Sequence, residues 1–425
     1  MGLATAWASG GPGPGSGGGD SLTTILFLLA VVGGAYLATH FVVGRLQQTF
    51  LFLSGFEYIA LGVALGPTEL SLVHAFDDMT AMGPVFAFAA GWVGLLYGLG
   101  FELKSLEIVG RPMRIALMDV LVTGGLVTAA AHAFFRSGLA MAVVADEQAW
   151  LSAMVLGCTA AAGSTSAANL LEQRYQGAET HLLPMLQRVA QLENLLSITL
   201  FGLLFCVFHV GSTLTSSPPS ASDWILLTVA GGIGLGVLFS IFIGNDKSGN
   251  NVFLAMVGIL LFASGAAFFL NLSALLVNLL LGMFLAQTRQ GVKIADQLER
   301  TGRPVSLTLL LFAGALWQPV PWIPALVLIL GLVGLRLLGK VIAVFLATVG
   351  TPLRTDLFRG MAAQGNVSVA MALSFQIVYD GPEVDLAYTA ILIAVVVHEL
   401  SSPRLLRGLL VDAGELRQDL PWIRS

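Results

Sequence analysis

Charged residues are scarce in this chain of 425 residues. Asp, Glu, Lys and Arg make up 11% of it and hydrophobic residues 56%, whereas a soluble protein carries about 25% charged residues. This composition predicts an integral membrane protein. Because the chain offers no basic face, it is not expected to bind nucleic acid.

Cysteines and catalytic motifs are also scarce. The two cysteines, Cys158 and Cys206, lie in apolar segments without a CxxC spacing. Without such a spacing, a disulfide framework or a zinc site is not expected. We expect both cysteines to be packed in the interior. The chain has no G-x-S-x-G motif, phosphate-binding loop or Cys/His cluster, so we expect neither an enzyme nor a bound cofactor.

The chain is instead rich in long apolar runs separated by short polar loops. A helix needs about 20 apolar residues to cross about 30 Å of hydrocarbon. The runs predict an all-α membrane protein with about thirteen transmembrane helices, at residues 22–43, 50–66, 83–101, 112–135, 148–171, 181–210, 223–244, 251–270, 272–288, 304–319, 321–348, 357–379 and 385–410.

The composition of the N-terminal residues and the distribution of Lys and Arg indicate how the chain is oriented in the membrane. Residues 1–21 are rich in Gly, Pro and Ser and lack the pattern of a cleaved signal peptide, which predicts a flexible tail. With the N-terminus outside, most of the 20 Lys and Arg residues fall on the inner side, as the positive-inside rule requires. We therefore expect a short cytoplasmic tail at 411–425, in a protein of a bacterial-type inner (plasma) membrane.

The seventh span leaves six spans on either side of it, which enter the membrane from opposite faces, as an inverted-topology repeat requires. The fifth span contains Gly and small polar residues at 163–166 (GSTS), and the twelfth contains a similar patch at 364–368 (QGNVS). Either patch alone is more simply explained by close helix packing. Their matched positions favour two helices that are broken near the midplane and cross there.

Glu193 lies inside the apolar run 181–210. A charge near the bilayer centre costs about 2.5 to 3.5 kcal/mol on insertion scales, so such an acid is usually paired, protonated or part of an ion path. Other charges also fall within the predicted spans, namely Asp119 in the fourth and Arg336 and Lys340 in the eleventh. Glu399, in the thirteenth, is expected to cap a helix end or to pair with Arg404 or Arg407.

Four segments together are similar to the motifs of one transporter family. Residues 62–70 (GVALGPTEL) resemble its G-x-x-x-G-P-x-x-L, and 98–103 (GLGFEL) its G-L-E-L turn. Residues 164–168 (STSAA) stand where the family has S-T-S-P-A or S-P-T-D-P, and 399–407 (ELSSPRLLR) resemble E-L-x-x-P followed by R-x-L-L. From about residue 24 to 414, the chain resembles the monovalent cation/proton antiporter superfamily, which carries the sodium/proton exchanger domain.

The resemblance implies two inverted units of six helices in a homodimer. The dimerisation part would lie at about 22–101 and 223–319, and the core part at about 112–210 and 321–410. Family members exchange Na+ or K+ for H+ across the bilayer by alternating access, on a carboxylate of the sixth span. The expected cation- and proton-binding residues are Glu193, Asn194, Asp119, Thr165 and Ser166. Supporting charges and polar groups are expected from Arg336, Lys340, Gln364 and Asn366, with no metal beyond the transported ion.

The sixth span departs from the family pattern, which has Asn-Asp or Asp-Asp with the second Asp as the cation ligand. In one register Glu193 and Asn194 replace that pair, so that the ligand has become Asn194. In the other, Ser197 and Ile198 replace the pair, and Glu193 matches a preceding Glu that, in such family members, pairs with an Arg of the eleventh span, which Arg336 resembles. Glu193 is therefore either a transport residue or one half of a buried ion pair.

Two functions remain open from the sequence. The first is a secondary transporter that exchanges a monovalent cation for protons. The second is a transport-inactive or regulatory membrane subunit that kept the antiporter scaffold after losing the ligand Asp. If Glu193 is paired with Arg336, Asp119 is the next candidate for the transported ion, although an Asp in this position is as simply explained by a bond to a neighbouring Ser or Thr.

Overall fold

The structure is a computed structural model, and it describes residues 55–66, 82–101, 110–139, 144–175, 180–210, 219–243, 249–288 and 291–416. Within these ranges all regular structure is helical. Seven segments of the described chain are long and apolar enough to cross a membrane, so the protein is an integral, multi-pass membrane protein. The span predicted at 22–43 and the predicted tail at 1–21 lie outside the described residues.

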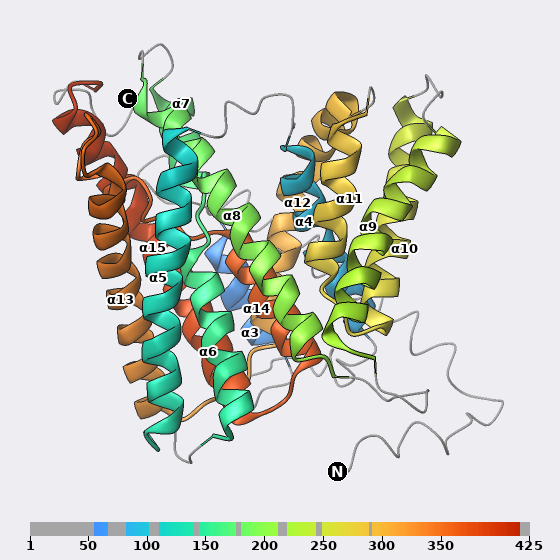
Figure 1. Cartoon of the computed structure of the whole chain (residues 1–425), viewed down its shortest axis with the longest axis horizontal. Helices are drawn as coiled ribbons and strands as arrows, with labels where there is room; N and C mark the ends of the chain where they lie inside the picture. Colours follow the sequence, from blue (N-terminus) through green and yellow to red (C-terminus); the bar gives the residue numbers. More distant parts are fainter. Residues whose placement is uncertain are drawn as a thin grey trace.

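One set of helices surrounds two interrupted segments, and we call it the crossing group (Figure 1). It consists of α5 (Arg111–Arg136), α6 (Asp146–Ala161), α7 (Ser166–Arg174), α8 (Leu182–Val207), α13 (Trp322–Thr348), the short 3-10 helix η4 (Leu357–Arg359), α14 (Asn366–Val378) and α15 (Pro382–Asp412).

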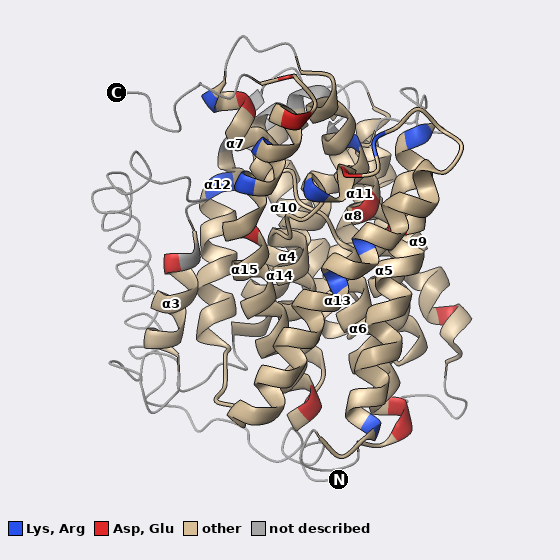
Figure 2. Cartoon of the chain, turned by 90° about the vertical axis from the view of Figure 1, so that its left-hand side faces the viewer, with Lys and Arg blue, Asp and Glu red and all other residues tan. Residues whose placement is uncertain are grey.

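The remaining helices pack mainly with one another and form what we call the flanking group. They are α3 (Phe56–Leu65), α4 (Gly83–Leu99), α9 (Ala221–Ile243), α10 (Gly249–Phe269), α11 (Ala274–Ala286) and α12 (Gly291–Ala315). Figure 1 shows α9, α10 and α11 on the side of the bundle opposite α5 and α13. Most Lys and Arg residues of the described chain gather toward the end of the bundle that carries α7 (Figure 2).

The predicted breaks in the fifth and twelfth spans are present. Helix α6 ends at Ala161 and α7 begins at Ser166, while the chain between η4 and α14 is extended before Asn366. The side chains of Gln364 and Ser368 both donate to the backbone carbonyl of Thr159, at 2.9 and 3.0 Å. The two interruptions therefore lie against each other, which places four helix ends inside the crossing group.

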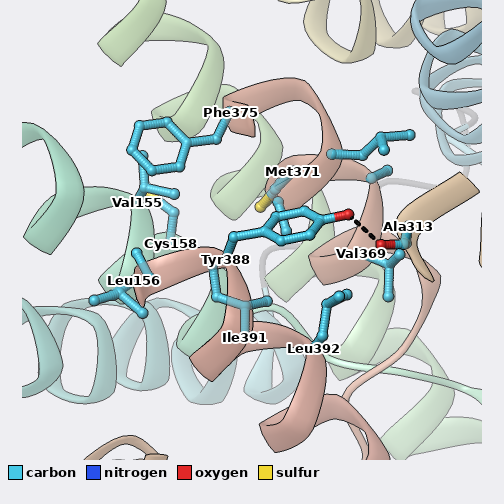
Figure 3. Packing of buried hydrophobic residues seen from close by; sticks show 14 of the residues in the cluster. Val155, Leu156, Cys158, Ala313, Val369, Met371, Phe375, Tyr388, Ile391 and Leu392 are labelled. Atoms are coloured by element: carbon cyan, nitrogen blue, oxygen red, sulfur yellow. Dashed lines mark hydrogen bonds between the residues drawn. The ribbon is translucent and has the colours of Figure 1, made fainter. Parts of the chain in front are cut away.

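Buried aromatic and aliphatic side chains join the crossing group to the flanking group. Tyr388 of α15 is 1% exposed and donates its hydroxyl hydrogen bond to the carbonyl of Ala313 in α12, at 2.6 Å. Figure 3 shows its ring among Val369 and Met371 of α14 and Leu392 of α15. A second hydrogen bond, from Trp317 Nε1 after the end of α12 to Thr389 Oγ1 of α15 at 3.1 Å, joins the same region. The rest of the Tyr388 contact is apolar, and it stabilises the interface by burial of hydrocarbon.

Helix α12 differs from its predicted span. It begins at Gly291, whereas the apolar run begins at 304. Residues 291–303 form a polar extension of the same helix, which a search for apolar length does not detect. Pro304 lies inside it, where proline removes one main-chain hydrogen bond but has not ended the helix.

Candidate ion-binding site

Arg336 lies between the two interruptions and donates to both. From α13 its guanidinium reaches the carbonyls of Ala160 and Ala162 at the end of α6, at 2.9 and 3.2 Å. It also reaches those of Ala362 and Ala363 before α14, at 2.6 and 2.9 Å. These are carbonyls that a broken helix leaves without main-chain partners. The fully buried Arg336 therefore fastens the two breaks together.

Of the two interpretations that the sequence left open for Glu193, the ion pair with Arg336 is absent from the part of the chain that the structure describes. None of the ion pairs in the described chain joins these two residues, and the donors of Arg336 are turned to the backbone. The cation next to Glu193 is Lys340, one helical turn further along α13, with Nζ 3.5 Å from Glu193 Oε1. Arg336 and Lys340 both reach the region where the two helix breaks meet, because residues four apart on α13 share a helix face.

Lys340 holds Asp119 more closely than it holds Glu193. Its Nζ is 2.7 Å from Asp119 Oδ2, and Thr123 donates to Asp119 Oδ1 at 2.7 Å. The bond to a neighbouring Thr that the sequence suggested for Asp119 is thus present, together with a lysine. Gly339 permits this geometry, because a Cβ there would come within 2.8 Å of the Thr123 backbone and push α13 away from α5.

Glu193 and its neighbours on α8 carry buried polar atoms without a protein partner. They are Oε2 of Glu193, both side-chain polar atoms of Asn194, and Oγ of Ser197. All three residues are at most 1% exposed. Glu193 Oε2 lies against Gly163, where a Cβ would clash with it, so this carboxylate borders the break between α6 and α7. Oxygens left free in this way are suitable ligands for a hard cation.

A second carboxylate, Glu399 of α15, lies on the other side of the break. The expectation that it pairs with Arg404 or Arg407 is wrong: Ser166 donates its hydroxyl to both carboxylate oxygens, at 2.8 and 2.7 Å. Glu399 lines a cavity of about 260 Å³ together with Thr165, Ser166 and Asn366.

The predicted site residues therefore separate into two places. Asp119, Glu193 and Lys340 form a buried triad, whereas Thr165, Ser166 and Asn366 line the cavity with Glu399. Arg336 and Gln364 bind the backbone of the crossing. Three further residues belong to these two places, namely Tyr97 and Ser164 in the cavity and Ser197 on α8. Ser164 is part of the polar patch at 163–166, and Ser197 stands in one register where the family has its ion-binding pair, although neither was among the expected ligands. Tyr97 has no such signal in the sequence.

Comparison with known proteins agrees with this arrangement. The family model for the transmembrane sodium/hydrogen exchanger matches residues 55–408. The chain belongs to the sodium/hydrogen exchanger family. Its fold is similar to the solved structure of the sodium proton antiporter MjNhaP1 from Methanocaldococcus jannaschii, with a TM-score of 0.62, 15% identity, and coverage of 94% of this chain and 99% of that one. A search of curated proteins found no match.

The charges in the crossing of this exchanger do not balance. Near the two helix breaks the described chain buries three carboxylates, Asp119, Glu193 and Glu399, and two cationic groups, Arg336 and Lys340. A fourth buried carboxylate, Glu383, lies in the first turn of α15, away from the breaks, and is not part of this set. One negative charge is left over when all five are ionised. A single proton or monovalent cation restores neutrality, and Glu193 is the carboxylate that still has a free oxygen beside the lysine.

Proposed function

We propose that this protein exchanges a monovalent cation for protons across the membrane, with Glu193 as the group that binds either one. The observation that supports this most is the free and buried Oε2 of Glu193, on the same helix as the unpartnered polar atoms of Asn194 and Ser197. Asp119 has partners on both oxygens, which makes it the support of Lys340 rather than the carrier. Na+ is the first candidate because the matched family is defined by sodium exchange, and K+ is the second.

Coupling follows from the cost of charge inside a bilayer. An unoccupied crossing carries one uncompensated negative charge, which is expensive to move through a medium of low dielectric constant. The crossing therefore changes its side of access only when a proton or a cation is bound. Since each neutralises the same single charge, the proposal predicts one-for-one exchange that does not depend on the membrane potential.

Alternating access would arise from movement of the crossing group against the flanking group. In this proposal the crossing group is the core part and the flanking group is the dimerisation part of a homodimer. Two inverted units of six spans each contribute helices to both parts, within about thirteen spans in all. The gathering of Lys and Arg toward the α7 end (Figure 2) supports a cytoplasmic position for that end, with the N-terminus outside.

Reconstitution into liposomes tests the proposal. Wild-type protein should dissipate an imposed pH gradient when Na+ or K+ is added, and clamping the membrane potential should not alter the rate. Glu193→Gln should reduce the exchange to that of protein-free liposomes. The matched control is Glu147→Gln, the same change at an exposed position in the first turn of α6, and it should leave the rate unchanged.

Asp119→Asn gives a second, different result. With Asp119 neutral, Glu193 is the nearest anion to Lys340, so the lysine competes with the cation and the KM for the cation should rise. Exchange that survives Glu193→Gln would remove Glu193 from the carrier role. A wild-type protein that responds to none of Na+, K+ and Li+ would favour the alternative function, a transport-inactive membrane subunit. That alternative is motivated by Asn194, which follows Glu193 where the family has its ligand Asp.

A further inference from the structure

The cavity beside Glu399 lies between the two helix groups. Ser164, Ser166 and Glu399 line it from the crossing group, while Tyr97 of α4 and Leu310 of α12 line it from the flanking group. Its volume of about 260 Å³ is enough for an ion with several water molecules, since a single water needs about 10 to 15 Å³ measured in this way. A cavity bordered by both groups must change shape if one group moves against the other.

The polar atoms around this cavity are mainly oxygens. Ser166 Oγ lies 2.8 and 2.7 Å from the carboxylate oxygens of Glu399, and Ser164 Oγ lies 2.6 Å from Ser166 Oγ. None of the ion pairs in the described chain includes Glu399, which is 4% exposed. Hydroxyls can turn their lone pairs toward a ligand, and a carboxylate with two hydroxyls suits a hard cation.

The cavity connects an exposed surface to the break in the helices. Asn169, at its outer end, is exposed. At its inner end Gly365 is so close to Ser164 and Glu399 that a Cβ would contact both. Gly163, the residue before Ser164, adjoins the Glu193 carboxylate. Glu399 therefore lines a cavity that extends from the exposed Asn169 to the helix break that Glu193 borders from the other side.

We propose that Glu399, with the hydroxyls of Ser164 and Ser166, forms a second, transient cation site that the ion occupies on its way between the α7 side and Glu193. The inference rests on the proposed function. Helices α7 and α14 begin at Ser166 and Asn366, so the partial positive charge of two helix N-termini offsets part of the negative charge of Glu399. A site on a conduction route has to bind an ion weakly enough to release it, and this offset provides that weakness.

Exchange measured from each side of the membrane tests the proposal. In oriented vesicles, Glu399→Gln should raise the KM for Na+ supplied on the α7 side by roughly tenfold, which corresponds to about 1.4 kcal/mol. The KM for Na+ supplied on the opposite side and the maximal rate should stay within about twofold of wild type. Glu399→Asp keeps the charge and should restore most of the affinity. Glu172→Gln, an exposed acid on α7, controls for general surface charge and should have no effect.

Each alternative outcome overturns this inference. A KM that rises equally from both sides would make Glu399 part of the common binding site. A lower melting temperature with unchanged KM would make it only a counter-charge for the helix N-termini.

If Glu399→Gln does not fold, Ser166→Ala takes its place, with a smaller increase in KM expected on the α7 side alone. Failure of the proposed function is distinguishable, because wild-type protein would then show no exchange from either side.

Discussion

Replacing Arg336 by methionine removes the guanidinium that fastens the two helix breaks. Four buried carbonyls, two from each break, would lose their donor. Each hydrogen bond to a charged group contributes about 1.5 to 3 kcal/mol, but burying the guanidinium costs several kcal/mol, which offsets part of that sum. The net loss on removing one partner from a buried charged network is about 3 to 5 kcal/mol. We expect Arg336→Met to be among the most destabilising single changes in the protein.

The assay is thermal unfolding of purified protein in detergent, followed by tryptophan fluorescence and by recovery of monodisperse protein. For a chain of 425 residues the expected free-energy loss corresponds to a fall of about 3 to 6 °C in melting temperature. Arg336→Lys should lie between wild type and Arg336→Met, since a compact ammonium cannot reach four carbonyls spread across two breaks. The matched control is Arg354→Met, at a partly exposed pair with Asp356, which should cost at most about 1 kcal/mol.

A normal melting temperature in Arg336→Met would refute this reasoning. If that variant also lost cation affinity while remaining stable, Arg336 would be acting on Glu193 through charge, as the sequence comparison first suggested, and not as a clamp on the backbone.

Two further predictions concern a helix contact and a surface ion pair. Gly339→Ala should slow exchange and lower the melting temperature, because its Cβ would meet the Thr123 backbone at 2.8 Å, whereas Gly334→Ala on the same helix has open space around it and should be neutral in both measurements. The hydrogen bond from Arg354 lowers the pKa of Asp356 below its ordinary 3.8, so the pair stabilises the fold above that pH and its contribution is lost as the pH falls through the folded-state pKa. The melting temperatures of wild type and Asp356→Asn should therefore converge as the pH falls below 3.8 and through the lower folded-state pKa, and a difference that stays constant from pH 7 into that range would contradict the assignment.

The helices and the breaks could be predicted from the sequence because they depend on local chemistry. Apolar runs define the membrane-crossing helices, and the patches at 163–166 and 364–368 weaken two of them through Gly and small polar residues. The start of α12 could not be found in this way, since its first turns are polar. In each case the reliable signal is the one carried by side chains within a few residues of the feature.

The partners of the buried charges depend on atoms that have no sequence signature. Arg336 binds main-chain carbonyls, and a carbonyl looks the same at every residue. Glu399 seemed to have arginine partners nearby in the chain, but Arg404 and Arg407 lie five and eight residues further on, not at the three- or four-residue spacing that brings helical side chains together. Its actual partner, Ser166, comes from α7, 233 residues away in the chain.

Proton release on cation binding tests the central claim most directly. Adding Na+ or K+ to purified protein in a weakly buffered solution should displace about half a proton per chain from wild type at the pH at which Glu193 is half protonated, because the two ligands compete for one carboxylate. Glu193→Gln should release none, and the exposed control Glu147→Gln should behave as wild type. Undiminished proton release from Glu193→Gln would contradict the account.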